Sequence, residues 1–172
     1  LPNITLNGLE RGLKHHLTVT LGAKQVERAK VNVVRYADDF VVTGDSKELL
    51  ETAVRPWIEQ FLREPGLQLS EEKTRIVPIE EGFDFLGWNF RKYRATGGVE
   101  KLLIKPNKKN VKAFYTRVRD LLARSISVPV DHLIRKLNPI LRGWAEYHKG
   151  VVAKAAFSRM DHLVYWRLMR WG

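Results

Sequence analysis

The sequence contains no cysteine, so it can form neither a disulfide framework nor a thiolate metal site, as is typical of a protein from a reducing compartment. It also lacks any apolar run long enough to cross a membrane, and its first residues do not have the basic and then apolar pattern of an export signal. No membrane partner is therefore expected. The missing initiator methionine favours a chain that was cut from a longer protein.

Acidic residues are scarce in the C-terminal part of the chain. Residues 1–100 contain 14 Lys and Arg against 15 Asp and Glu, a net charge of −1, whereas residues 101–172 contain 16 against 4, a net of +12. A region this basic attracts polyanions and gains affinity by releasing counterions from phosphates, which predicts nucleic acid as the partner. A solvated basic surface and an anionic membrane surface are the alternatives.

The hydrophobic content of 44% is enough for a core, in one domain or two small ones. In the N-terminal part, residues 3–16 predict a short helix with Asn3 as its cap, and the apolar repeat after Gly44 predicts a second helix to Leu62 with a kink at Pro56. Strands are predicted at residues 31–36, 40–43, 67–69, 74–77 and 83–90. Gly97-Gly98 predicts a linker or a hairpin turn.

The C-terminal part shows apolar residues at helical spacing. One helix is predicted at residues 111–122, and another begins near Val130 and breaks at Asn138-Pro139, where Pro139 begins a new helix that ends at Lys149-Gly150. A last helix covers residues 156–171. The aromatic residues of these helices are predicted to pack inward; they are Trp144, Tyr147, Trp166 and Trp171. His148 and His162 lack partners at ligand spacing, so no metal site is expected there.

Asp38 and Asp39 are predicted at the tip of the hairpin formed by residues 31–43. Adjacent carboxylates on a rigid turn are suitable oxygen ligands for the paired divalent ions of two-metal nucleotidyl transfer. The alternative is a solvated turn, where aspartate is common.

The segment Tyr36-Ala37-Asp38-Asp39 resembles motif C of reverse transcriptases. Three further segments resemble motifs of the same enzymes in the family order: residues 1–10 the tail of motif B, residues 66–74 motif D, and residues 83–88 the primer-grip hairpin of motif E. The resemblance implies that Asp38 and Asp39 bind Mg²⁺ and that Phe85, Leu86, Gly87 and Trp88 grip the primer. Lys73 is expected to neutralise the triphosphate, with a solvated surface lysine as the alternative.

Residues 137–148, 157–163 and 166–171 resemble the maturase-specific domain of group II introns. This resemblance separates the chain from retroviral, retron and telomerase relatives, which share the palm but not this thumb. Helices with apolar inner faces and basic outer faces can follow the phosphates of a duplex. The predicted nucleic-acid contacts are Lys105, Lys108, Lys109, Lys112, Arg117, Arg119, Arg124, Arg135, Lys136 and Arg142; helix solubility is the alternative for each.

Together these resemblances imply an α+β fold: the C-terminal part of a polymerase palm at residues 1–100, followed by an all-α basic thumb of about three helices at residues 101–172. The implied function is an RNA-directed DNA polymerase that also binds group II intron RNA as a maturase. Its expected partners are an RNA template with a DNA primer, intron RNA and deoxynucleoside triphosphates.

No residue matches the motif A aspartate, so the fingers and the rest of the palm are expected in cis or in trans, and the chain alone is expected to be inactive. A splicing factor without polymerase activity and a basic adaptor with an accidental palm-like hairpin are the alternatives. The expected location is the bacterial cytoplasm near the nucleoid, or an organelle.

Overall fold

The computed structural model describes residue 6, residues 8–94 and residues 97–171. The chain forms two compact units, Leu1–Pro78 and Ile79–Gly172, each with its own antiparallel sheet. This mixture of helices and small antiparallel sheets confirms the predicted α+β class. In the described part of the chain, no helix is both long enough and apolar enough to cross a membrane. The change of charge at Glu100 falls inside the second unit, and a division between palm and thumb at that residue stays a prediction.

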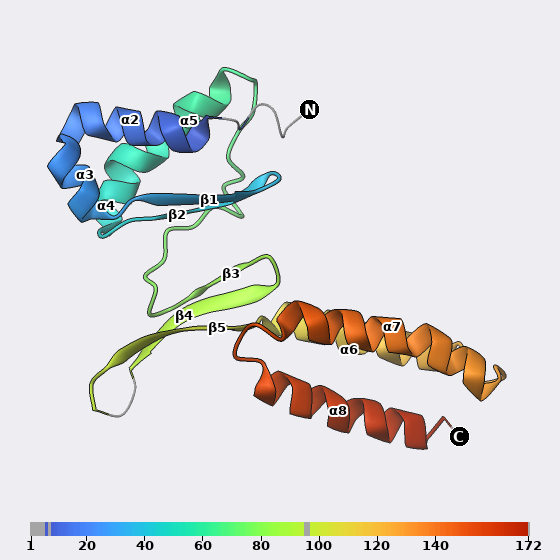
Figure 1. Cartoon of the computed structure of the whole chain (residues 1–172). Coiled ribbons are helices and arrows are strands. Elements are labelled where there is room, and N and C mark those ends of the chain that lie inside the picture. Colours follow the sequence, from blue (N-terminus) through green and yellow to red (C-terminus); the bar gives the residue numbers. More distant parts are fainter. Residues whose placement is uncertain (1–5, 7, 95–96, 172) are drawn as a thin grey trace. The chain divides into compact units, whose positions relative to one another are not determined.

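In the first unit, helices cover one face of a two-stranded sheet (Figure 1). Its core is formed by Leu9, Leu13 and Leu17 on one side and by Val54, Ile58 and Leu62 on the other, each triplet at a spacing of four residues that places it on one helical face. The elements are α2 (Leu9–Leu21), α3 (Ala23–Ala29), β1 (Asn32–Tyr36), β2 (Asp39–Thr43), α4 (Lys47–Leu49), η1 (Leu50–Val54) and α5 (Arg55–Arg63).

The first predicted helix was wrong at both ends within the described residues. Residues 6 and 8 lie in turns, so the helix begins at Leu9, and it continues to Leu21 because Leu17 extends the buried stripe by another turn. The predicted cap at Asn3 lies outside the described residues.

The irregularity predicted at Pro56 takes the form of a π-helical turn, η1, just before it. Proline has no N–H to donate to the carbonyl four residues earlier, and its ring crowds that carbonyl. A wider turn relieves both problems while keeping the apolar stripe on one face.

The two strands predicted at residues 67–69 and 74–77 are absent, which corrects the sequence-based prediction. A strand requires a hydrogen-bonded neighbour, and the one sheet among the described residues of this unit pairs only β1 with β2. Leu67 and Leu69 instead pack their side chains against the helical core. Their apolar alternation reflects burial without sheet formation.

The second unit begins with a three-stranded antiparallel sheet in the order β3 (Phe83–Phe85), β4 (Trp88–Arg94) and β5 (Glu100–Pro106). The single strand predicted at residues 83–90 is in fact a hairpin, because Leu86 and Gly87 both have positive φ and reverse the chain. Gly97-Gly98 lies in a hairpin turn, since Arg94 pairs with Glu100 across it.

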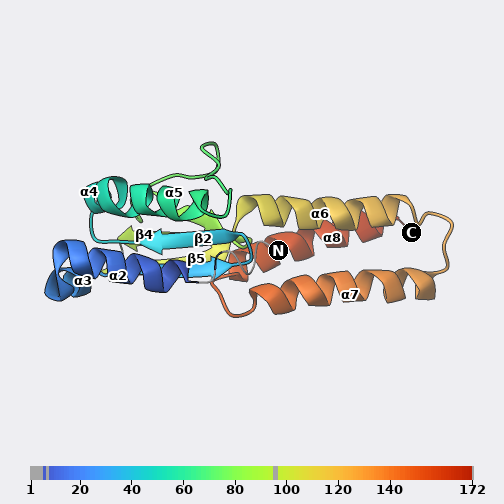
Figure 2. The ribbon, with the colours of Figure 1, turned by 90° about the horizontal axis from the view of Figure 1, so that it is seen from above.

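Three helices follow the sheet: α6 (Lys108–Ala123), α7 (Val130–His148) and α8 (Lys154–Met169). They run beside one another as a bundle (Figure 2). Their common core consists of Phe114, Val118, Leu122, Leu133, Leu137, Met160 and Val164. The bundle agrees with the predicted count of about three helices in the thumb. The prediction that residues 101–172 are all-α was wrong for residues 101–106, which belong to β5 because they pair with β4.

The break predicted at Asn138-Pro139 does not occur, because α7 continues through Pro139. An interior proline costs a helix about 3 kcal/mol. Leu133 and Leu137 before the proline, and Ile140 and Leu141 after it, all pack into the same core. Burial of one such side chain stabilises by about 1.5–3 kcal/mol, so keeping both halves on one axis outweighs the local cost.

The aromatic residues of the bundle divide into two groups. Trp144 and Trp171 pack against the core as predicted. Trp166 is 51% exposed and Tyr147 is 46% exposed, so the prediction of a core position was wrong for both. Helical spacing does not separate the two groups, because α8 carries apolar residues on its inner and its outer face.

Candidate functional site

The predicted carboxylate pair lies at a two-residue turn of the first unit. Tyr36 pairs with Asp39 across the β1–β2 hairpin, so Asp38 is in the turn and Asp39 is the first residue of β2. Both side chains are exposed. The turn therefore presents two acceptor groups to solvent from a rigid ribbon.

The side of the sheet on which Asp39 lies follows from the register. Val33, Phe40 and Val42 pack against the helical core, and residues alternate between the two faces of a strand. Asp39 consequently shares the opposite face with Tyr36, which is 64% exposed. Neither aspartate points into the apolar interior, an arrangement that would have ruled out a metal-binding role.

Ala37 adopts a φ of 55°, in the left-handed region that residues with a Cβ rarely occupy. Such a conformation costs about 1–2 kcal/mol, and strained residues of this kind are concentrated at functional sites. Glycine or asparagine would be the expected residue at this position. Sequence reasoning missed the strain, although an alanine in a two-residue hairpin turn is the signal that could have revealed it.

The donor chemistry of this turn fits a hard divalent cation, which prefers carboxylate oxygens. Two carboxylates are too few to hold a pair of ions. Among residue 6 and residues 8–94 and 97–171, no cluster of three or more Asp, Glu, His or Cys side chains could hold a metal. The described residues by themselves therefore do not form a two-ion site, and metal binding by Asp38 and Asp39 stays a prediction.

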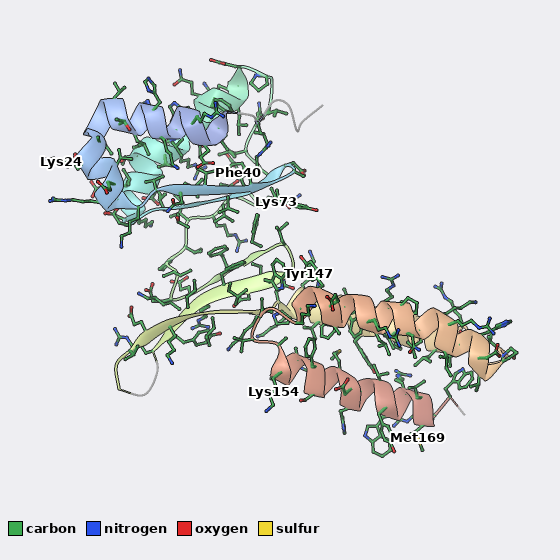
Figure 3. The ribbon with its side chains drawn as sticks, viewed as in Figure 1. Lys24, Phe40, Lys73, Tyr147, Lys154 and Met169 are labelled. Carbon is green, nitrogen blue, oxygen red and sulfur yellow. The ribbon has the colours of Figure 1, made fainter. Side chains whose placement is uncertain are left out.

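Lys73 lies in the first unit on the segment after α5 (Figure 3). Its backbone N–H donates to the carbonyl of Ser70 at 3.1 Å in a turn, and its side chain is exposed without an ion pair to any described residue. Its proposed role toward a triphosphate stays a prediction.

The predicted primer-grip residues form the β3–β4 turn of the second unit, and two helices hold that turn. The hydroxyl of Tyr147 donates to the carbonyl of Leu86 at 2.6 Å, and the backbone N–H of Asn107 donates to the carbonyl of Gly87 at 3.0 Å. Tyr147 is at the end of α7 beside the hairpin (Figure 3). Both carbonyls of the turn are therefore bonded to the helical bundle.

Glycine is required at position 87 for steric as well as conformational reasons. Its φ is 82°, and a Cβ there would lie 2.9 Å from the amide nitrogen of Asn110. Any side chain would push the turn away from α6.

A buried histidine, missed by sequence reasoning, completes the attachment of the turn. The indole N–H of Trp88 donates to Nδ1 of His148 at 2.9 Å, so the ring carries its proton on Nε2 and donates it to Oδ1 of Asn110, 3.0 Å away. The indole of Trp144 donates to the same oxygen at 2.9 Å. His148 is fully buried, and burial lowers its pKa because the charged ring would lose its hydration.

The predicted nucleic-acid contacts are all accessible except for one that is half-buried. Lys105 is the half-buried residue, and its ammonium lies 4.2 Å from the centre of the Tyr93 ring. Arg119 pairs with Asp120, and Arg135 pairs with Asp131. The others form no ion pair with a described residue and are exposed; they are Lys108, Lys109, Lys112, Arg117, Arg124, Lys136 and Arg142.

The start of α6 concentrates positive charge where a helix least tolerates it. Lys108, Lys109 and Lys112 stand at its N-terminal end, where the helix dipole already contributes positive potential, and no acidic residue is present in the first turn. Cations there destabilise the helix slightly. An external anion would relieve this repulsion.

Comparison with known families finds two matches along the chain. Residues 1–90 match the family model for reverse transcriptase (RNA-dependent DNA polymerase), and residues 111–172 match that for the group II intron maturase-specific domain. The chain belongs to the group II intron reverse transcriptase and maturase family.

Two curated relatives of this family member are each named Maturase-like protein 1. The one from Euglena longa is 32% identical over 156 residues, which are 87% of this chain and 28% of the relative. The one from Euglena gracilis is 32% identical over 122 residues, 69% of this chain and 25% of the relative. The chain thus spans about a quarter of the length of these maturase-like proteins.

Ala37→Gly is expected to raise the free energy of unfolding by about 1 kcal/mol, because glycine adopts positive φ without strain. The measurement is a urea titration followed by circular dichroism. Ala23→Gly is the matched control in the same unit: Ala23 is exposed at the start of α3, and its replacement should lower stability by about 0.5–1 kcal/mol. A loss of stability in both variants would contradict the strain at Ala37.

Acid should destabilise the second unit through His148. Its pKa is lower in the folded than in the unfolded state, so the unfolded chain binds the proton first as the pH falls. The stabilising contribution of the neutral, buried His148 ring is fully present above about pH 6.5, the ordinary pKa of histidine, and is lost as the pH falls below that value. Urea unfolding followed by tryptophan emission at a series of pH values measures this.

His148→Asn should be less stable than wild type at neutral pH and should lack most of this pH dependence. His162→Asn, at an exposed position of α8, should retain it. Equal pH dependence in wild type and His148→Asn would show that another group is responsible.

Proposed function

We propose that this chain is the catalytic-aspartate and thumb part of an RNA-directed DNA polymerase whose thumb also binds group II intron RNA. The observation that carries the proposal is the strained, exposed turn that presents Asp38 and Asp39 from a rigid hairpin. A solvated turn gains nothing from an alanine at positive φ, whereas a metal site gains fixed carboxylates.

Asp38 and Asp39 would hold the divalent ions, with Mg²⁺ as the expected metal because it prefers carboxylate oxygens and bound phosphates. When bound, such ions stabilise charge on the attacking and leaving oxygens of nucleotidyl transfer. The protein's own contribution is the fixed position of the two carboxylates on the hairpin. Lys73 would add positive charge near the triphosphate of an incoming deoxynucleotide.

The β1–β2 sheet supports a need for further palm residues, in cis or in trans. Among the described residues it has only two strands, and a two-stranded sheet leaves backbone groups unpaired at both of its edges. An additional strand with a third aspartate would pair one edge and complete the ligand set. The 172-residue chain alone is therefore proposed to lack polymerase activity.

Asp38→Asn in the longer protein that contains this chain should abolish extension of a DNA primer on an RNA template, because the amide provides a neutral and weaker metal ligand. Asp45→Asn is the matched control, with the same change of charge at an exposed residue just beyond β2. Single-turnover primer extension with Mg²⁺ is the measurement. Undiminished extension by Asp38→Asn would refute the catalytic assignment.

A maturase that binds intron RNA without polymerising DNA is the second candidate. The curated relatives are named maturase-like proteins, and the described carboxylates do not form a complete two-ion site. If the longer protein assists splicing but no variant or condition gives primer extension, this second function replaces the first. The fixed aspartates favour the polymerase.

For the thumb, the first turn of α6 supports phosphate binding. Neutralising Lys109 and Lys112 to glutamine should weaken binding of the 172-residue chain to an RNA hairpin, and log K should fall with log salt less steeply, by about 1.5 for two lost phosphate contacts. Lys24 and Lys30, exposed lysines of the first unit, are the control pair for the same double change to glutamine. Equal slopes for both double variants would show that α6 makes no phosphate contact.

A further inference from the structure

The two faces of the β4–β5 hairpin differ in whether their cations form ion pairs. The register pairs Asn89 with Lys105, Arg91 with Leu103 and Tyr93 with Lys101, and these six residues share one face. We call them the cationic face. The opposite face carries Trp88, Phe90, Ile104 and Pro106 near the bundle, with Lys92, Arg94, Glu100 and the apolar Leu102 at the far end.

Two acidic side chains belong to this three-stranded sheet: Glu100 on the opposite face, and Asp84 on the cationic face beside Asn89. Glu100 lies on the opposite face, where it pairs with Lys92 and Arg94. Asp84, which faces Asn89 across β3 and β4, accepts a hydrogen bond from the Asn89 amide at 2.8 Å. The three cations of the cationic face form no ion pair with a described residue.

A tyrosine ring holds two of these cations in place. The guanidinium of Arg91 lies 5.2 Å from the centre of the Tyr93 ring, and the ammonium of Lys105 lies 4.2 Å from it. Arg91 also donates its Nε–H to the backbone carbonyl of Glu80 at 2.8 Å, which leaves its terminal nitrogens for another acceptor. Ordering the side chains in advance reduces the entropy lost on binding.

Protection of a sheet edge accounts for only part of this pattern. Lysines on an edge strand prevent association of sheets, and β5 is an edge strand. Arg91 and Tyr93 lie on β4 beyond the three residues that pair with β3, and the N–H of Lys92 between them donates to the carbonyl of Ile79, so this side of β4 is partly covered by the preceding segment. Edge protection also does not explain why one ring orders two cations on the same face.

We propose that the cationic face binds the phosphodiester backbone of a nucleic-acid strand, through Arg91, Lys101 and Lys105 with Tyr93 as the positioning residue. Lys101 and Lys105 are four residues apart, about 13 Å along the strand, a length over which one strand of a duplex presents about four phosphates. Both cations already lie against the Tyr93 ring, so the ring is not free to stack on a base. The face would therefore recognise phosphate charge and not base sequence. The inference rests on the proposed nucleic-acid binding and extends it beyond the thumb helices.

The test compares two double variants of the 172-residue chain that remove the same charge from opposite faces. Arg91→Gln with Lys101→Gln alters the cationic face, and Lys92→Gln with Arg94→Gln alters the other face of the same two-stranded segment. Fluorescence titrations with an RNA hairpin, and with an RNA–DNA hybrid of the same sequence, are repeated over a range of salt concentrations. Circular dichroism verifies the fold of each variant.

The cationic-face variant is expected to lower the slope of log K against log salt by about 1.5, and the opposite-face variant to leave it unchanged. A loss confined to the hybrid assigns the strand to primer and template, and a loss confined to the hairpin assigns it to structured RNA; both support the inference. If the two variants give equal slopes while the wild-type chain binds RNA, the inference about the cationic face is overturned and the proposed thumb function is not.

If the wild-type chain binds neither nucleic acid, the proposed thumb function fails as well. Vesicles of anionic phospholipid provide the remaining arm. Release from vesicles by the cationic-face variant, with nucleic-acid binding unchanged, would overturn the inference in favour of a membrane surface.

Discussion

The hydrogen bond from Trp88 to His148 is the interaction on which the second unit depends, because it joins a β-turn to the buried end of a helix. Asn110 receives N–H groups from His148 and Trp144, so a single side-chain amide of α6 is bonded to two residues of α7, and His148 connects both helices to the turn. These polar atoms lie among stacked aromatic rings, where an unpaired donor would cost more than it would in water. Loss of any one partner would therefore leave a buried polar atom unpaired and would strongly destabilise the second unit. The network also fixes the position of the turn.

The turn that this network holds contains the residues expected to grip a primer. Its two carbonyls bond to α6 and α7, and its glycine admits Asn110 in close approach. In structural terms the turn belongs to the same compact unit as the helical bundle. A chain that resembles a palm up to residue 90 therefore changes its structural unit earlier, at Pro78.

The positive charge of the second unit is arranged with few compensating carboxylates. Many cations of the second unit have no carboxylate to pair with, and several stand where they repel a helix dipole or one another. Their presence destabilises the free protein slightly, and a polyanion would remove that cost. Tyr93 adds order to two of them, so the surface is arranged in advance of binding.

The sequence by itself determined the class of fold, the family, the acidic hairpin and the basic helices, because each depends on local periodicity or on a short run of residues. Tertiary structure decided the rest. Pro139 stays inside α7 because packing on both sides exceeds its local cost, and Leu67 and Leu69 lack a strand because no neighbour pairs with them. The role of His148 was equally invisible, since its partners Trp88 and Asn110 are 60 and 38 residues away. Periodicity predicts which side of an element is buried, but only the folded chain decides what that side meets.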